Sequence, residues 1–300
     1  MTRINYDSSD MTLALVRFGG VTPRVFDILL RQFGTVENIL MAESSELLEI
    51  EGLTTDTAES ISTADRKLKN ASDYKTELKQ REINITTRFE SEYPNTLLEI
   101  NDPPPLVYSR GRLPQKDKKL VAVTGAANAT QEGLALTTKL AAELVAKKVQ
   151  LVSSLTSGID SAVHLGSKGA GGFSFAVLDS GFDKVTGDAE IPLAIDIVQT
   201  GGVISEYAPD VEFIESNFKQ SNRLIAGMAQ AVVVTEFYQD SKRALDVLEY
   251  CNQIGKLSFI LIDESHGALS DESSLAKAVE WGAIPMTGLD KIDQIIKALV

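Results

Sequence analysis

From Leu120 onward, short runs of apolar residues alternate with stretches that are compatible with helix. Stretches such as Gln131–Lys148 and Ser241–Gly255 separate most of these runs, which read LVAVTG, VQLVSS, FSFAVLDSG, GGVISEY, AVVVTEF and LSFILID. Near-continuous apolar strands separated by helices are typical of a parallel sheet that is covered on both faces. The sequence therefore predicts an α/β fold with a doubly wound, mainly parallel sheet.

The amino-terminal part has a different pattern, because apolar residues recur at helical spacing through residues 11–62. Thr22 and Pro23 are typical of a helix N-cap followed by a first-turn proline. The stretch SELLEIEGLTTDTAESI predicts two helices joined by a glycine turn at Gly52, as in a helix-hairpin-helix. Such hairpins often contact the DNA backbone, but Glu49 and Glu51 beside the turn favour a role in packing alone.

A polar segment separates the two patterns. Residues 63–90 predict a helix, and the prolines that follow exclude helix and predict an extended lead-in with a strand near Leu106–Ser109. A chain of 300 residues suits one large α/β domain and a small companion. We expect an all-helical domain of helix-hairpin-helix or SAM-like type over residues 1–75 and the α/β domain over residues 76–300.

Composition narrows the class of protein. Cys251 is the single cysteine, so no intrachain disulfide is possible, which fits a reducing cytoplasm. The chain has only two histidines in addition to this cysteine, so we expect no metal site. We also expect no cofactor. The amino terminus lacks an apolar signal core, and no stretch approaches the roughly 20 apolar residues of a membrane span. The net charge of −13 argues against a nucleic-acid partner, unless cations gather on one face.

Three strand-end turns of the predicted sheet are rich in small and polar residues. Ligands of doubly wound sheets bind at the carboxyl ends of strands, where small residues let backbone amides approach an anion. The turns are Thr124–Thr130, the stretch SSLTSGIDSAVH after VQLV, and SNRLIAG, which we expect to open the helix before AVVVTEF. The candidate phosphate-binding residues of the first two turns are Gly125, Asn128, Ser153, Ser154, Ser157 and Gly158.

A tight strand–helix turn whose serines cap the next helix explains the same residues equally well. The stretch is neither a P-loop nor a complete G-x-G-x-x-G. Asp160 is most simply a first-turn acid, and His164 either pairs with it or packs under the turn. No nucleophile or metal-ligand set completes an acid–base mechanism, so no catalytic residue is assigned.

Basic residues flank the third turn and the next strand end. Asn222 and Arg223 precede an expected apolar helix, where a guanidinium can make two charge-assisted bonds to phosphate. Lys219 lies one turn earlier, and Lys242 and Arg243 follow the strand AVVVTEF. These side chains are candidates for one phosphate-binding face, although a solvated helix start equally explains Lys242 and Arg243.

Five segments, in order, resemble the DNA-processing protein A family (DprA, also called Smf). They are YPNTLLEINDPPPLVYSRG, VAVTGAANATQEG, VSSLTSGIDSAVHLGSKGAGGFSFAVLDSGFD, GGVISEYAP and FKQSNRLIAGMAQAVVVTEF. Each motif is loose, but five in the family's order with similar spacing are specific. The resemblance covers roughly Tyr93 to Ala283, and the helical amino-terminal part also fits the family.

This resemblance implies an extended Rossmann-like domain that binds single-stranded DNA, helps to load the recombinase RecA, protects incoming DNA in transformation, commonly forms a homodimer and is not an enzyme. The DNA backbone is expected in the pocket formed by the three turns. Position by position, Gly125 matches the first turn, Ser153, Ser157 and Gly158 match the second, and Asn222 and Arg223 match the third.

The chain also departs from the family pattern. Ala127 and Ser221 stand where the family has arginines, and Ser154 stands where it has glycine. Lys219, Lys242 and Arg243 are the cations expected to substitute for them. The chain ends soon after Trp281-Gly282-Ala283, so we expect no carboxyl-terminal winged helix.

Three functions stay open at this point. The first is a noncatalytic single-stranded DNA-binding recombination mediator, with Phe218, Phe237 and Tyr238 as candidates for base stacking. The second is a nucleotide-ligand sensor or nucleotide-processing enzyme on the same scaffold, although the P-G-G-x-G-T-x-x-E signature of related phosphoribohydrolases is not found. The third is a protein-interaction scaffold with a vestigial pocket and the acidic helical part as its working surface.

Overall fold

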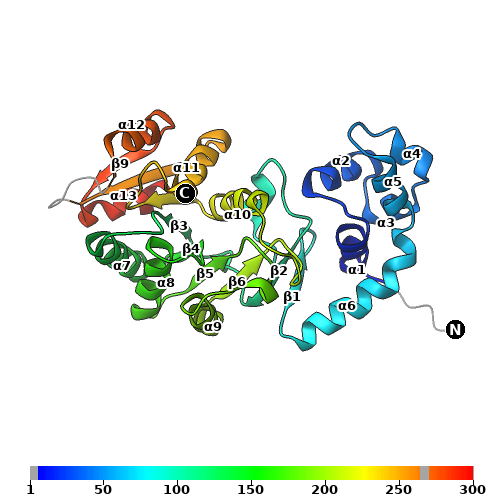
Figure 1. The fold of residues 1–300 in the computed structure, drawn as a ribbon, viewed down its shortest axis with the longest axis horizontal. Helices are drawn as coiled ribbons and strands as arrows, with labels where there is room; N and C mark the ends of the chain where they lie inside the picture. Colours follow the sequence, from blue (N-terminus) through cyan, green and yellow to red (C-terminus); the bar gives the residue numbers. More distant parts are fainter. Residues whose placement is uncertain (1–5, 264–269, 300) are drawn as a thin grey trace. The chain divides into compact units, whose positions relative to one another are not determined.

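The computed structural model describes residues 6–263 and 270–299 (Figure 1). The chain divides into two compact units, Met1–Tyr93 with Asn101–Ser109 and Pro94–Ile100 with Arg110–Val300. The domain division after residue 75 that the sequence suggested stays a prediction.

The first unit consists mainly of short helices around an apolar core. Its helices are α1 (Ser8–Leu13), α2 (Pro23–Phe33), α3 (Val36–Met41), α4 (Ser44–Leu48), α5 (Thr55–Ser62) and α6 (Leu68–Gln80), with a π-helical turn η1 (Ala14–Phe18) and a 3-10 turn η2 (Ala64–Lys67). The core includes Leu15, Phe26, Leu29, Ile39, Leu47 and Ile61. Strands β1 (Asn84–Thr87) and β2 (Leu106–Gly111) pair in antiparallel register, with Ile85 opposite Tyr108.

Two sequence predictions about this unit are confirmed. The Oγ1 of Thr22 accepts a hydrogen bond from the backbone N–H of Val25, and Pro23 is the first residue of α2. Helices α4 and α5 form the predicted hairpin, and Gly52 in the turn between them has φ +89°, a conformation that favours glycine.

In its described residues, the second unit is built on seven parallel strands. They are β3 (Leu120–Thr124), β4 (Gln150–Ser154), β5 (Ser174–Val177), β6 (Gly202–Ser205), β7 (Ala231–Val234), β8 (Leu257–Ile262) and β9 (Ile284–Thr287), in the spatial order β6-β5-β4-β3-β7-β8-β9. Strands β3 to β7 are buried along their whole length, which explains their continuous apolar runs. The predicted doubly wound, mainly parallel sheet is confirmed.

Helices cover both faces of this sheet (Figure 1). On one face, α7 (Gln131–Ala146), α8 (Ile159–Gly169) and α13 (Ile292–Ala298) share an apolar core with alternate residues of the strands, such as Val121, Val123 and Leu151. Helices α10 (Glu215–Met228) and α11 (Lys242–Ile254) pack against each other, and α10 also contacts β3, β4 and β5. The remaining elements are α9 (Glu190–Thr200), α12 (Glu272–Glu280) and the 3-10 turns η3 (Asn95–Glu99), η4 (Phe182–Lys184) and η5 (Leu289–Lys291).

The expectation that a helix opens at Ser221 was wrong, because α10 begins at Glu215. No glycine or proline interrupts residues 215–220, so the helix extends back by more than one turn. Asn222 and Arg223 therefore lie in the middle of α10 and not at its amino end. None of the helices among residues 6–263 and 270–299 is both long enough and apolar enough to span a bilayer.

Candidate functional site

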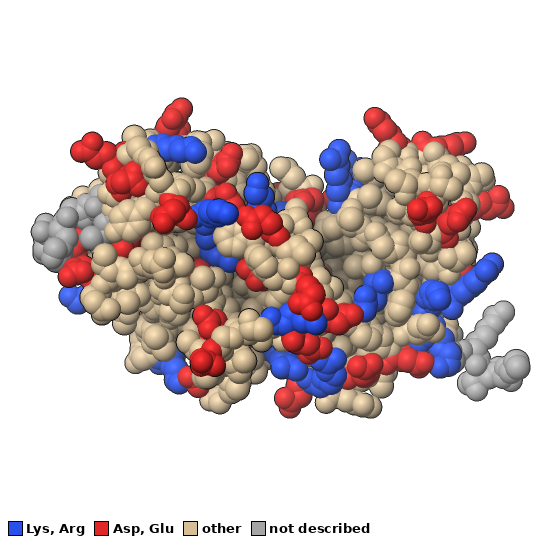
Figure 2. Space-filling model, in the orientation of Figure 1, with Lys and Arg blue, Asp and Glu red and all other residues tan. Residues whose placement is uncertain are grey.

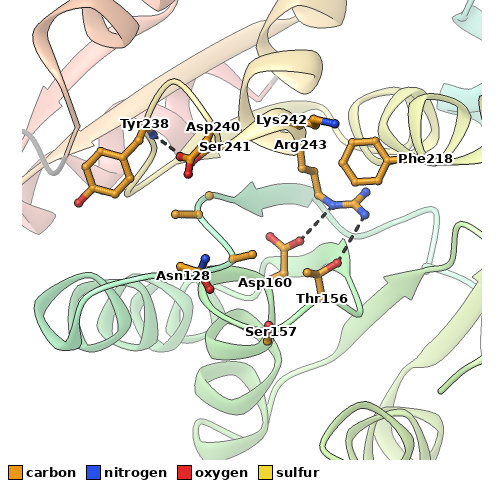
Figure 3. A pocket seen from close by; sticks show the side chains of 13 residues that line it. Asn128, Thr156, Ser157, Asp160, Phe218, Tyr238, Asp240, Ser241, Lys242 and Arg243 are labelled. Carbon is orange, nitrogen blue, oxygen red and sulfur yellow. Dashed lines mark hydrogen bonds and ion pairs between the residues drawn. The ribbon is translucent and has the colours of Figure 1, made fainter. Parts of the chain in front are cut away.

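A pocket lies at the point where the strand order of the second unit reverses. The chain runs outward from β3 through β4, β5 and β6, and then returns to the other side of β3 as β7. Such a switch point leaves a crevice at the carboxyl ends of the strands, where ligands of this fold class bind. A cavity of about 250 Å³ occupies this place (Figure 3), lined by Gly125, Ala126, Ala127, Asn128, Thr156, Ser157, Asp160, Phe218, Tyr238, Asp240, Ser241, Lys242 and Arg243.

Backbone hydrogen bonds join the turns after β3 and β7 to each other and to the start of α8. The N–H of Ala126, after β3, donates to the carbonyl of Glu236, after β7, at 2.7 Å. The N–H of Ile159, at the start of α8, donates to the carbonyl of Ala126 at 3.0 Å. Gly158 has φ +80°, and a Cβ there would lie 2.2 Å from the carbonyl oxygen of Ala127. The small residues of the sequence thus let the turns pack closely.

Arg243 is the centre of a polar network at the floor of the pocket. Its guanidinium lies within 3.5 Å of Asp160 and within 3.2 Å of Asp179. It also donates to Asn222 and Ser221 of α10, and its Cζ lies 4.4 Å from the centroid of the Phe218 ring (Figure 3). The side chain is only 6% exposed. Arg243 is therefore a buried, ion-paired residue, and the alternative of a solvated helix start was wrong for it.

The hydroxyl groups of the second turn mostly form hydrogen bonds to other groups of the protein. Ser153 donates to the carbonyl of Val123 at 2.7 Å, and Ser154 donates to the carboxylate of Asp160, which also accepts from Thr124 at 2.8 Å. Both serines are buried. Their hydroxyls thus satisfy buried polar groups, and neither lines the switch-point pocket.

His164 packs beneath this turn. Its Nε2 lies 2.8 Å from the carbonyl oxygen of Ser154, and the ring is buried. Burial lowers the pKa of His164 despite the opposing effects of that hydrogen bond and of Asp160. The imidazole is therefore neutral near pH 7, and no direct bond to Asp160 forms between these described residues.

Glu236 is a buried carboxylate that the sequence reasoning missed. It accepts hydrogen bonds from the N–H and Oγ1 of Thr130, the residue that caps α7, at 3.0 and 2.9 Å. It also accepts from the hydroxyl of Tyr238 at 2.8 Å, and desolvation together with this bond raises the pKa of Tyr238 to about 12. Glu236 therefore supplies negative charge at the amino end of α7. Its position directly after a buried apolar strand is the signal that could have identified it.

Several groups at the pocket remain available to a ligand. Asn128 and Ser157 line it, and within the described part of the chain their backbone N–H groups have no acceptor. Lys242 also lines the pocket and is 71% exposed, with a surface ion pair of 3.3 Å to Glu215. Surface pairs of this kind contribute little free energy, so Lys242 can exchange Glu215 for another anion.

The predicted site residues on α10 do not line the pocket. Arg223 is 5% exposed and donates to both carboxylate oxygens of Glu206, at 2.9 and 3.1 Å. Lys219 is exposed on α10 but does not line the cavity. Asn222 is buried, where it accepts from Arg243 and donates to Asp246. Five of the predicted site residues line the cavity, namely Gly125, Asn128, Ser157, Lys242 and Arg243. Gly158 does not line it but packs against the backbone of Ala126 and Ala127, which do.

The pocket is lined by equal numbers of cationic and carboxylate side chains. Lys242 and Arg243 line it together with Asp160 and Asp240. Figure 2 likewise shows Lys and Arg interspersed with Asp and Glu on the face that it presents. A second cavity of about 350 Å³ shares Thr156 and Arg243 with the first and continues along the ends of β4 and β5, where Lys184 and Phe213 contribute to its lining. The described residues hold no group of three His, Cys, Asp or Glu side chains suited to a metal ion.

The parallel sheet and its strand order define a Rossmann-like α/β protein with a pocket at the strand ends. Residues 84–294 match the family model of DNA recombination-mediator protein A, and the chain belongs to this family. The Smf protein of Synechocystis is 31% identical over 267 residues, which cover 86% of this chain and 67% of that protein. The chain spans about half the length of the DprA proteins of Bacillus subtilis (54%) and Streptococcus pneumoniae (51%) in their alignments.

Solved structures agree on the fold. The crystal structure of DNA processing protein A from Streptococcus pneumoniae has a TM-score of 0.77 at 23% identity and covers 95% of this chain and 97% of that one. A structure of DNA processing protein A from Helicobacter pylori, described for its single-stranded DNA binding mode, has a TM-score of 0.60 at 21% identity. It covers 71% of this chain and 96% of that one.

Proposed function

We propose that this protein binds single-stranded DNA and holds the sugar–phosphate backbone at the switch-point pocket. The observation that carries the proposal is the cavity itself, which Asn128, Ser157 and the exposed Lys242 line together. The backbone N–H groups of Asn128 and Ser157 have no acceptor among the described residues. Backbone amides and a mobile ammonium bind phosphate oxygens without reading the base. Family membership, and the single-stranded DNA described for the Helicobacter pylori relative, agree with this assignment.

Aromatic residues give the pocket a surface for bases. Tyr238 and Phe218 line it and are partly exposed, so each can stack on an unpaired base. Phe237 is fully buried, so it is not part of this proposed surface. Stacking favours single strands over duplex, because duplex bases present no free face.

A guanidinium from another residue also lies close to the position at which the family pattern has an arginine. Ser221 replaces the first arginine of the family's R-N-R pattern. The Oγ of Ser221 accepts a hydrogen bond from Nη1 of Arg243 at 3.2 Å. We infer that Arg243 of α11 makes the DNA-backbone contact expected of that arginine. Asp160 and Asp179 partly neutralise its charge. The net charge of −13 then limits nonspecific adhesion to nucleic acid.

The family assignment also supports a wider proposal. A single-stranded DNA-binding member of a recombination-mediator family is expected to assist a RecA-type recombinase, to self-associate as a homodimer and to act in the cytoplasm by binding, without catalysing a reaction. These properties rest on family membership alone.

Lys242→Ala is expected to weaken binding of a fluorescent oligothymidylate and to reduce the salt dependence of that binding. Each lost phosphate contact to a single strand lowers the slope of log K against log salt by about 0.7. Fluorescence anisotropy over a salt series measures both quantities. Lys147→Ala is the matched control, because Lys147 also forms an exposed ion pair, with Asp293, at the far end of α7.

Unchanged binding by Lys242→Ala, or an equal loss in Lys147→Ala, contradicts the proposed site. The phosphate of a single nucleotide would contact the same N–H groups and Lys242, so a nucleotide sensor is the second candidate function. Mononucleotides that raise the melting temperature more than the oligonucleotide does favour this second candidate. Arg223→Ala is unsuitable for the test, since it leaves Glu206 without its buried partner.

A further inference from the structure

The first unit has an apolar groove of about 550 Å³ that plays no part in the proposed DNA site. Met11, Leu40, Met41 and Leu68 line it, with carboxylates at its rim. Met41 is 80% exposed, although it is a large apolar side chain at the end of α3. Methionine side chains adapt to varied apolar partners, and they are over-represented at surfaces that bind several sequences.

The segment that supplies most of the lining of this groove is acidic, and the exposed Arg66 and Lys67 follow it directly. Residues 35–65, which include α3, α4 and α5, contain eight Asp and Glu and no Lys or Arg. All eight side chains are exposed, and none forms an ion pair with another described residue. They are Glu37, Glu43, Glu46, Glu49, Glu51, Asp56, Glu59 and Asp65. Of these, Glu37, Glu43 and Asp65 line the groove itself.

This charge argues against DNA as the occupant. In the helical hairpin of α4 and α5, the turn amides that would approach a phosphate lie beside the exposed Glu49 and Glu51. Carboxylates at that position repel a polyanion and supply none of the cations on which phosphate binding depends. A ligand that buries Met41 and pairs with the rim must be apolar on one side and positively charged on the other.

We propose that the groove is the docking site for a basic amphipathic helix of a partner protein. An amphipathic helix places apolar residues at i, i+3, i+4 and i+7 into a hydrophobic groove. Lysine and arginine on its flanks would meet Glu37, Glu43 and Asp65, and such complementary charges fix orientation and speed association. The site lies wholly within the first unit, so this inference stands or fails apart from the DNA proposal.

The test uses the full chain and a fluorescent synthetic peptide of about 15 residues, with leucines at helical spacing and lysines elsewhere. Met41→Ser is expected to weaken saturable peptide binding about tenfold, which corresponds to the loss of one buried methionine side chain. The pair Glu37→Gln with Asp65→Asn is expected to weaken it about threefold and to reduce its salt dependence.

Matched controls separate the groove from general electrostatic attraction. Ile195→Ser removes another exposed apolar side chain, and the pair Glu249→Gln with Glu280→Gln removes the same amount of charge from α11 and α12. Normal affinity in these controls, with loss in the groove variants, supports the proposal. Equal loss in both sets, or equal binding of a peptide with glutamate in place of lysine, overturns it. Circular dichroism melting checks that every variant is folded.

Discussion

Replacing Arg243 by methionine is expected to lower the free energy of unfolding by about 3–5 kcal/mol. The guanidinium is 6% exposed and is the ion-pair partner of Asp160, whose side chain is 3% exposed. Methionine keeps much of the apolar contact with Phe218 but leaves the carboxylate of Asp160 buried without a cation. Urea denaturation followed by circular dichroism measures the change.

The adjacent residue provides the control for this prediction. Lys242→Met removes a charge from an exposed side chain with a surface ion pair, so we expect a change within about 1 kcal/mol. A second variant, Arg243→Met with Asp160→Asn, is expected to recover part of the lost stability, because the uncompensated charge is gone. If Arg243→Met alone is as stable as Lys242→Met, the buried network does not hold the pocket together.

Gly158→Ala is expected to cost about 2–4 kcal/mol of stability. Its backbone has φ +80° and ψ −133°, a region open almost only to glycine, and the added Cβ would lie 2.2 and 2.4 Å from the carbonyl oxygens of Ala127 and Ala126. Both obstacles are backbone atoms, so relieving them must displace the turn after β3 and widen the pocket. Thermal or urea unfolding measures the loss.

Gly169→Ala, at the other end of the same helix, is the control. No atom of the described residues lies within 4 Å of a Cβ built there. Because alanine is also the better helix former, stability should stay the same or rise by up to about 1 kcal/mol. Equal stability of the Gly158 and Gly169 variants would show that the turns after β3 and β4 are not packed as described.

The sheet was predictable because each of its central strands is buried on both faces. Runs such as AVVV of β7 need no partner information to be identified as strands. Strand β9, with the sequence IPMT, was missed, since three of its four residues are exposed and a proline interrupts the pattern. The start of α10 was also misplaced, because nothing in the residues from Glu215 to Gln220 forbids helix and sequence alone shows no boundary there.

The position of the pocket was predictable from the sequence, but the directions of the side chains around it were not. Strand ends and small residues identified the turns, and Gly125, Asn128 and Ser157 do line the pocket. Whether a hydroxyl or a guanidinium points into the cavity depends on buried partners from distant segments. Ser154 turns towards Asp160, and Arg223 turns towards Glu206, because burial makes an unpaired polar group costly. Such pairings arise only when the strands are assembled.

Hydrogen–deuterium exchange with and without an oligothymidylate is the most direct test of DNA binding at the pocket, because backbone N–H groups there have no acceptor in the part of the chain that the structure describes. We expect the oligonucleotide to slow exchange in the segments 125–128 and 156–161, with little change in the acidic hairpin over residues 44–62. Saturating oligonucleotide that leaves both of these segments unchanged, while exchange slows elsewhere in the chain, would contradict the account.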